Sequence, residues 1–270
     1  MSSNTLTPVA SFTLPLVGLG LILLGTLAGL ANGHDPAFIN VADPLKPIFS
    51  SPYWLGTDDL GRDLWARLAQ GGLISLWVGF ATALASVVLG GILGIVAARC
   101  GGWVDAWVMR GVDVLSSLPS LMLVVLLSVV LGKSLWALVL SITLLSWPDA
   151  TRVIRAATRQ QLIEPYMEAY TALGGGTGRW LSHYWVRNVA DVLILATTLT
   201  VPRAILAEST LSFLGLGVAP PLSSWGTLAS DGWQLVRVAP SLLILPTACI
   251  FITLLGFNSI GDWLEARLKR

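Results

Sequence analysis

The sequence predicts an all-α polytopic membrane protein with six transmembrane helices. Of its 270 residues, 54% are hydrophobic and only 11% are charged, against about 25% charged in an ordinary soluble domain, and the mean hydropathy is +0.76. No charged residue lies between Arg67 and Arg99, or between Arg237 and Asp262. Each interval is longer than the ~20 apolar residues that cross a bilayer. The net charge of +1 and the lack of a basic run give no indication of a nucleic-acid partner.

Six apolar runs are the expected spans: Ser11–Ala31, Leu73–Ala98, Val114–Leu131, Ser134–Trp147, Asp191–Leu216 and Pro240–Ile260. The first run has no positive n-region and is long for a signal peptide, which favours an uncleaved span. The fourth run is short for a span. We expect an N-terminal span with its outer loop (1–72), a transmembrane core (73–263) whose cytoplasmic loop covers 151–188, and a cytoplasmic tail (264–270).

Lysine and arginine residues set the expected orientation, because cytoplasmic loops are enriched in them. With six spans both termini share one side, which carries ten of these residues: Arg99, Arg110, Arg152, Arg155, Arg159, Arg179, Arg187, Arg267, Lys269 and Arg270. The other side carries five: Lys46, Arg62, Arg67, Lys133 and Arg237, while Arg203 lies inside a span. We therefore expect a plasma-membrane protein with both termini in the cytoplasm.

Two long outer segments, His34–Gly72 and Gly217–Ala239, are rich in Pro, Gly, Asp and Trp. This composition favours ordered loops with short interfacial helices. Four tryptophans in them suit the headgroup region of the bilayer, where aromatic residues gather: Trp54, Trp65, Trp225 and Trp233.

The least membrane-like segment is EPYMEAYTALGGGTGRWLSHYWVRN, Glu164–Asn188. Pro165 suits the first turn of a helix, and the three glycines from Gly174 end that helix because glycine adopts the left-handed cap conformation without steric cost. Thr177 is an expected N-cap of a second, amphipathic helix. Its apolar face is expected to lie along the membrane surface and consists of Trp180, Leu181, Tyr184 and Trp185.

Within this segment, EAYTALGG resembles the EAA loop of the membrane subunits of bacterial ATP-binding-cassette importers. That pattern is Glu-Ala-Ala, three residues and then Gly, and it is matched by Glu168, Ala169 and Gly174. Three further blocks resemble the dipeptide, oligopeptide and nickel permease family in its shorter-loop type: LGTDDLGRDLWARL (Leu55–Leu68), SWPDATRVIRA (Ser146–Ala156) and ILAESTLSFLGLGVAPPLSSWGTL (Ile205–Leu228). The departures are Tyr170 for alanine, the extra glycines, and Arg187 where the family usually has proline.

The resemblance implies the type I importer (MetI-like) permease fold and the translocation of a small solute: a peptide, nickel, a metal chelate or a similar molecule. It implies four kinds of partner besides the lipid bilayer: a second permease subunit, two cytoplasmic ATPase subunits and an extracytoplasmic solute-binding protein. ATP and magnesium are then bound by the ATPases, with no cofactor in this chain. The residues expected to couple to the ATPase are Tyr166, Glu168, Ala169, Tyr170, Ala172, Leu173 and Gly174.

On the outer side, the residues expected to meet the binding protein are Asp58, Asp59, Arg62, Asp63 and Trp225. An ordered loop whose charges form surface ion pairs is an equally good interpretation of this set.

Charged residues inside the expected spans are a second signal. Glu208 and Arg203 lie in the fifth span, where a charge costs at least about 2.5–3.5 kcal/mol, so such residues usually face the bundle interior. A separation of five residues does not favour a direct pair within one helix. Either Glu208 and Arg203 line or gate the translocation path, or Glu208 makes a structural hydrogen bond to a neighbouring helix. Gly90 and Gly94 form a G-x-x-x-G pattern that predicts close helix packing.

Several activities have no support in the sequence. LGKS at Leu131–Ser134 lacks the preceding glycine of a P-loop, and His34 and His183 have no neighbours at metal-ligand spacing. Cys100 and Cys249 are not expected to form a disulfide, and no nucleophile–base arrangement is apparent. The chain is therefore expected not to be an enzyme. An ion-gradient-driven secondary transporter and a non-transporting membrane scaffold remain alternatives to the importer subunit.

Overall fold

The computed structural model describes residues 10–268, which form helices joined by loops, with no β-strand in that range. The helices are α1 (Ala10–Ala31), α2 (Leu64–Cys100), α3 (Gly102–Ser117), α4 (Ser120–Leu131), α5 (Leu135–Leu162), α6 (Pro165–Ala172), α7 (Thr177–Arg179), the π-helical turn η1 (Trp180–Trp185), α8 (Val186–Phe213), α9 (Trp225–Gln234) and α10 (Ser241–Leu268). Lys269 and Arg270 of the expected cytoplasmic tail lie outside the described residues.

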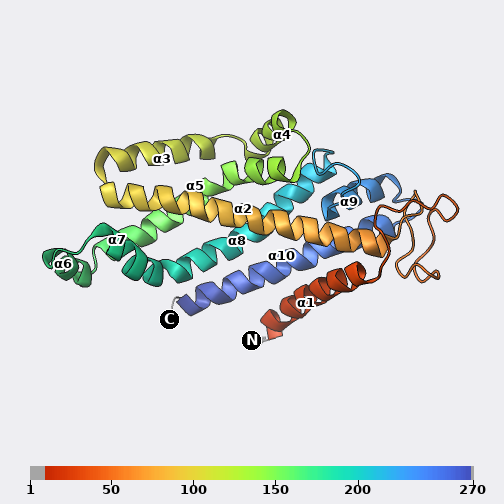
Figure 1. Ribbon diagram of the computed structural model, residues 1–270, viewed down its shortest axis with the longest axis horizontal. Coiled ribbons are helices and arrows are strands. Elements are labelled where there is room, and N and C mark those ends of the chain that lie inside the picture. Colours follow the sequence, from red (N-terminus) through yellow and green to blue (C-terminus); the bar gives the residue numbers. More distant parts are fainter. Residues whose placement is uncertain (1–9, 269–270) are drawn as a thin grey trace, which may run out of the picture.

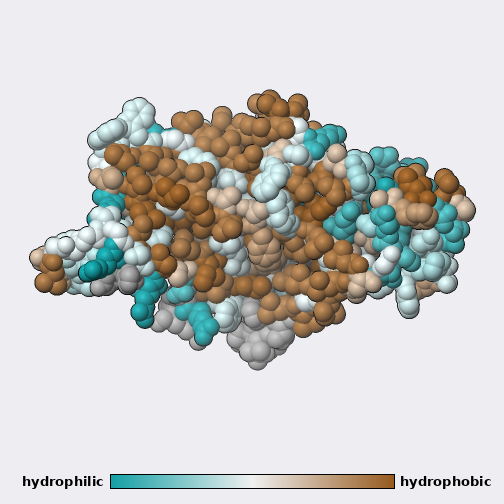
Figure 2. Space-filling model, in the orientation of Figure 1, coloured by the Kyte–Doolittle hydropathy of each residue, from teal (hydrophilic) through white to brown (hydrophobic). Residues whose placement is uncertain are grey.

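The long helices run side by side along the longest axis of the molecule (Figure 1). Hydrophobic surface covers the middle of the molecule and hydrophilic surface lies at both ends (Figure 2). Four helices of the described chain, α2, α5, α8 and α10, are long and apolar enough to cross a bilayer, or five spans if the bent pair α3–α4 is one span. The apolar part of α1, Pro15–Ala31, is shorter. The all-helical membrane fold is confirmed, whereas the number of six spans is not.

Helix α2 packs closely on α5 through the two glycines of the G-x-x-x-G pattern. A Cβ atom at Gly90 would lie 2.7 Å from Ala150 Cβ and 2.8 Å from the backbone nitrogen of Thr151. A Cβ atom at Gly94 would lie 2.9 Å from the carbonyl oxygen of Thr151. Only glycine allows the two backbones to approach this closely, as the pattern predicted.

The third span differs from its expected course, Val114–Leu131. The helix begins earlier, at Gly102, and breaks at Leu118–Pro119, where α3 and α4 meet at 91°. Pro119 has no backbone N–H and its ring disfavours the helical conformation for the preceding residue. Leu118 is accordingly extended, with φ −82° and ψ 144°.

The fourth span is longer than its expected course, Ser134–Trp147. Helix α5 passes through Pro148 and continues to Leu162, so the first part of the expected loop 151–188 is helical. Two arginines on this extension, Arg155 and Arg159, bind the carboxylate of Asp105 near the start of α3. These ion pairs and the contact with α2 stabilise the added turns.

The two segments expected on the outer side differ in their structure. The chain between α1 and α2 forms turns and two isolated β-bridges rather than the expected interfacial helices, and α2 runs without a break through the boundary expected at residues 72–73. The segment after α8 does contain the expected short helix, α9. Its N-terminus carries a capping box formed by Ser224 and Thr227.

The contact of α2 with α5 gives a first prediction. Gly90→Ala is expected to lower the free energy of unfolding by about 1–3 kcal/mol, because the new methyl group overlaps backbone atoms of α5 that cannot move aside. Thermal unfolding of the purified protein in detergent measures the change.

Gly91→Ala is the matched control. Its Cβ would meet only Ile154 Cδ1, at 3.5 Å, which is an ordinary contact. Since alanine favours a helix over glycine by up to about 1 kcal/mol, this variant should be as stable as the parent or more stable. Equal destabilisation by both variants would contradict the packing described here.

Candidate functional site

The candidate coupling loop, Glu164–Asn188, lies at one tip of the molecule, at the opposite end from the loop between α1 and α2 (Figure 1). Helix α6 forms as the sequence predicted, with Pro165 in its first turn. Gly174 ends it in the left-handed conformation, with φ +76°. Thr177, expected as an N-cap, instead starts α7 after Gly176, and its hydroxyl accepts a hydrogen bond from Arg99 at 2.8 Å.

Helix α6 turns one face outward and one face inward. Glu168, Ala169 and Ala172 are exposed, and Leu173 is 89% exposed. On the inner side Met167 is buried and Tyr166 is half-buried, with its hydroxyl accepting a hydrogen bond from Asn188 at 3.1 Å. The outward face consists of two alanines, the carboxylate of Glu168 and the apolar side chain of Leu173. Because alanine side chains are small, another protein can approach this face closely.

Tyr170 and the triple glycine, both departures from the family pattern, are parts of one arrangement. The Tyr170 ring lies on the backbone of Gly175, and a Cβ atom at residue 175 would overlap it. The Tyr170 hydroxyl donates a hydrogen bond to the carbonyl oxygen of Gly176 at 2.8 Å. Tyr170 therefore braces the turn that follows α6 and is half-buried there.

The root of the loop is a buried apolar cluster and not the membrane surface that the sequence suggested. Trp180 is fully buried and Trp185 is 5% exposed. They pack with residues of α2, α5, α6 and α8: Val87, Ala150, Ile154, Met167 and Val189. Trp185 also donates a hydrogen bond to the hydroxyl of Thr158 at 2.8 Å, and the Arg99 guanidinium lies over the Trp180 ring. The Tyr184 side chain lies outside the described residues.

This cluster fixes α6 to three long helices. Met167 contributes from α6 itself, Val87 from α2, Ile154 from α5 and Val189 from α8. Arg187 is exposed in the first turn of α8, so the helix continues through the position where the family usually has proline. Helix α6 is therefore packed against α2, α5 and α8 through this cluster.

At the end opposite the candidate coupling loop, three of the five residues expected to dock a partner are buried. Asp58 accepts hydrogen bonds from Arg62 and Arg67, and Asp63 caps α2 by accepting from the backbone of Trp65 while it pairs with His34. Asp59 is exposed and Arg62 is half-buried. Asp58 and Asp63 are therefore paired within an ordered loop, but their carboxylates are buried and not at the surface as that interpretation expected.

Trp225, expected in the headgroup region and as a docking residue, is fully buried, which corrects both expectations. Its indole N–H donates to the carbonyl oxygen of Leu68 at 3.0 Å. Gly71 and Gly72 on α2 leave the space that its ring occupies. The first residue of α9 is thus an anchor between α9 and α2. Trp54 and Trp233 are exposed.

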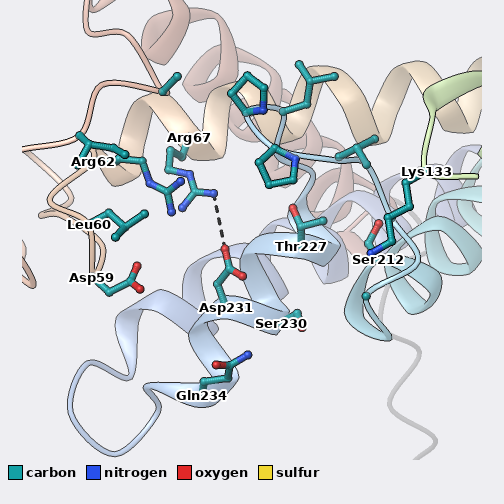
Figure 3. A pocket seen from close by; sticks show the side chains of 18 of the residues that line it. Asp59, Leu60, Arg62, Arg67, Lys133, Ser212, Thr227, Ser230, Asp231 and Gln234 are labelled. Atoms are coloured by element: carbon teal, nitrogen blue, oxygen red, sulfur yellow. Dashed lines mark ion pairs between the residues drawn. The ribbon is translucent and has the colours of Figure 1, made fainter.

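A cavity of about 750 Å³, called the polar cavity below because charged side chains meet apolar ones in its lining, opens at this end. Figure 3 shows Arg62 and Arg67 on one side, Asp231, Ser230 and Gln234 of α9 on another, and Lys133 from the turn between α4 and α5. Asp231 lies 3.6 Å from Arg67. Burial raises the pKa of the Asp231 carboxyl, and the positive charges of Arg67 and Arg62 oppose that rise.

The two charged residues of the fifth span occupy different environments. Glu208 is fully buried and accepts hydrogen bonds from Ser75 of α2 at 3.0 Å and from Ser212 at 2.6 Å. Its carboxyl therefore ties α2 to α8, which is the structural alternative considered for it. Arg203 makes no pair with Glu208; it pairs with Asp149 of α5 at 3.2 Å.

Asp149 was not selected from the sequence. It lies two residues beyond Trp147, the expected end of the fourth span. The signal was available, because SWPDATRVIRA places a carboxylate only two residues beyond an apolar run. The described residues contain no group of three or more His, Cys, Asp and Glu side chains that could hold a metal ion.

Comparison with known proteins identifies the family. Residues 90–270 match the family described as binding-protein-dependent transport system inner membrane component. The chain belongs to this family. It is 38% identical over 266 residues to the oligopeptide transport system permease protein OppC of Bacillus subtilis, covering 98% of this chain and 86% of that one. The OppC of Escherichia coli K12 is 38% identical, covering 94% and 83%, and the dipeptide permease DppC of Bacillus subtilis is 39% identical, covering 81% and 69%.

A solved structure shows the same fold. The inward-facing MetNI methionine ABC transporter matches with a TM-score of 0.56 at 18% identity, over 74% of this chain and 97% of that chain. The predicted family and the MetI-like fold are therefore confirmed. This family member is a multi-pass protein of the inner membrane and the membrane component of a transport system.

The Tyr170 brace gives a second prediction. Gly175→Ala should destabilise the coupling loop by about 1–3 kcal/mol, because the new methyl group displaces the Tyr170 ring from the turn. The measurement is the rate of limited trypsin cleavage after Arg179, which should rise. Gly176→Ala is the matched control, since that residue has an ordinary φ of −83° and open space around its Cβ. In a Tyr170→Ala background, which already lacks the brace, Gly175→Ala should cause no further rise in the cleavage rate; a further rise of the same size would contradict the brace.

The buried outer carboxylates give a third prediction. Asp63→Ala should lower the free energy of unfolding by about 1–2 kcal/mol through loss of the α2 cap. Asp59→Ala, at an exposed site four residues earlier, should leave the thermal unfolding midpoint unchanged. A larger effect at Asp59 than at Asp63 would reverse this assignment.

Proposed function

We propose that this chain is one permease subunit of a peptide importer that is driven by ATP hydrolysis in partner subunits. The observation that carries the proposal is the outward face of α6, mounted by a buried cluster on three long helices. The chain's relatives of 37–39% identity are named as oligopeptide, dipeptide and putative peptide permeases, which supports a peptide over nickel or a metal chelate as the solute.

In this proposal α6 is the coupling helix that docks on a cytoplasmic ATPase. Ala169 and Ala172 allow close approach, Glu168 supplies a polar anchor and Leu173 an apolar one. Tyr166 and Tyr170 act from within, by holding α6 and its following turn in place. Closure of the ATPases then moves α6 as a rigid body, and the buried cluster passes the movement to α2, α5 and α8.

The proposed assembly contains this chain, a second permease subunit, two ATPase subunits and an extracytoplasmic solute-binding protein. The arginine-rich end that carries α6 faces the cytoplasm, and both termini lie on that side. ATP and magnesium are bound by the ATPases, and this chain supplies no catalytic group. The binding protein docks over the polar cavity beside Asp59, Arg62 and Asp231. From this position it releases the solute into the cavity.

Reconstitution into lipid vesicles tests the proposal. Vesicles that contain all the subunits should accumulate a peptide only when ATP and the binding protein are present. Accumulation by this chain alone, driven by an ion gradient, would instead establish a secondary transporter. Absence of transport with all partners assembled would favour a membrane scaffold.

The coupling surface gives a fourth prediction. Gly174→Asp should abolish ATP-driven transport and weaken co-purification of the ATPases, because φ is +76° at this residue and a side chain strains the turn that ends α6. Gly178→Asp is the control: it adds the same charge four residues later, where φ is not positive and the Cβ site is open. Normal transport and normal ATPase binding in Gly174→Asp would refute the docking role.

A further inference from the structure

Four charged side chains form a continuous series across the exposed face of α3, α5 and α8. Asp113 of α3 pairs with Arg152 of α5 at 3.0 Å, Arg152 lies 3.7 Å from Asp149, and Asp149 pairs with Arg203 of α8 at 3.2 Å. The last pair is open to its surroundings, since 63% of the Asp149 side chain and 70% of the Arg203 side chain are exposed.

The Asp149–Arg203 pair lies deep within the spanning helices. Arg203 lies 17 residues after the start of the 28-residue helix α8, a distance of about 25 Å at 1.5 Å per residue. It lies 10 residues, or about 15 Å, before the end of the same helix. Asp149 lies about 21 Å along α5 from Leu135 by the same measure. Neither group is near a helix end, where a long side chain could reach the headgroups.

An exposed ion pair at this depth cannot face hydrocarbon without a large penalty. Charged residues within spans almost always face a bundle interior or a water-filled cavity. Lipid therefore does not cover this face of α5 and α8 in the assembled transporter. The apolar face of α10, which exposes Ile244 and Phe251, has the opposite character.

A hollow of about 230 Å³ lies at the same place. Its polar lining consists of Ser120, Ser146, Asp149, Thr200 and Arg203. Ser120 is the first residue of α4, directly after the break at Pro119, and no side chain caps this helix start. Backbone groups freed by such a break at membrane depth require water or protein partners. The hollow therefore leaves room for water beside both the ion pair and the uncapped start of α4.

We infer that Asp149 and Arg203 form a station on the translocation path that takes a zwitterionic solute by its two charged ends. This inference rests on the proposed peptide import and adds the chemistry of the path. Asp149 accepts hydrogen bonds from the solute ammonium, and Arg203 donates to its carboxylate. The two residues neutralise each other when the path is empty, so the solute exchanges one set of ion pairs for another.

This exchange explains how a path through the membrane can accept charged termini of many different peptides. The station binds only the free amino and carboxyl groups, which all such solutes have in common. Side-chain selection is left to other parts of the transporter. A single unpaired charge at this depth would bind one terminus and repel the other.

Thiol labelling in the assembled complex tests the location. Ser146→Cys places a thiol at the border of the hollow, about 16 Å from the start of α5. The control, Phe251→Cys, places an exposed thiol at a similar distance, about 15 Å, from the start of α10. Both are made in a background with Cys100 and Cys249 replaced. A charged, membrane-impermeant thiol reagent should modify Ser146→Cys in at least one nucleotide state, with its access changed by ATP, and should not modify Phe251→Cys. Complete protection of Ser146→Cys in every state would show a buried subunit interface and overturn the inference.

Neutralisation tests the chemistry. The double variant Asp149→Asn, Arg203→Gln removes both charges together, so it leaves no unpaired charge in the membrane. It should assemble with its partners and keep ATPase activity that the peptide-loaded binding protein stimulates, yet transport an unblocked dipeptide at least about tenfold more slowly, as expected for loss of charge-assisted hydrogen bonds. Glu208→Gln, whose side chain is buried away from the hollow, is the variant with which the transport rate is compared.

The outcomes separate the two proposals. Transport by the double variant at the parent rate would overturn the station while leaving the importer intact. Loss of transport together with loss of assembly would show a structural ion pair and also overturn it. If the parent complex itself shows no ATP-driven peptide transport, the proposed function fails, whatever the labelling of Ser146→Cys shows.

Discussion

The close contact between α2 and α5 is the constraint on which the other parts of the molecule depend. Gly90 and Gly94 bring the two backbones together, and the same region of α5 continues into Ile154 and Thr158. These residues receive Trp180 and Trp185 from the coupling loop. A wider separation of α2 and α5 would therefore open the apolar cluster that holds α6 at the tip of the molecule.

Helix α2 also joins the two ends of the protein. Its 37 residues span about 55 Å. At its N-terminal end Asp63 caps it, and Arg67 pairs with Asp58 and Asp231 near the polar cavity. At the other end Arg99 reaches Thr177 and the Trp180 ring beside the coupling loop. One rigid helix thus contacts both places where we propose that partner proteins bind.

The distribution of charge follows from the cost of placing ions in lipid. Asp58, Asp63 and Glu208 are buried with hydrogen-bonding partners, and Asp105 is shared between Arg155 and Arg159. Asp149 and Arg203 differ because they are paired and yet open. That combination, at the depth of the spans, marks a surface that meets water or protein and gives the permease a polar side.

The sequence by itself determined the fold class, the family and the short helix α6. Long uncharged runs require a membrane, and Pro165 and Gly174 set the ends of α6 through local backbone preferences that act without tertiary contacts. The tertiary structure alone decided which polar and aromatic residues face outward. Trp225, Trp180 and Trp185 looked interfacial because tryptophan suits both a headgroup region and a core, and only packing against α2 and α5 buries them. The pairing of Asp149 likewise depends on tertiary structure, because α5 continues past Pro148 and places Asp149 beside Arg203. A local sequence pattern cannot predict a contact between residues that are 54 positions apart.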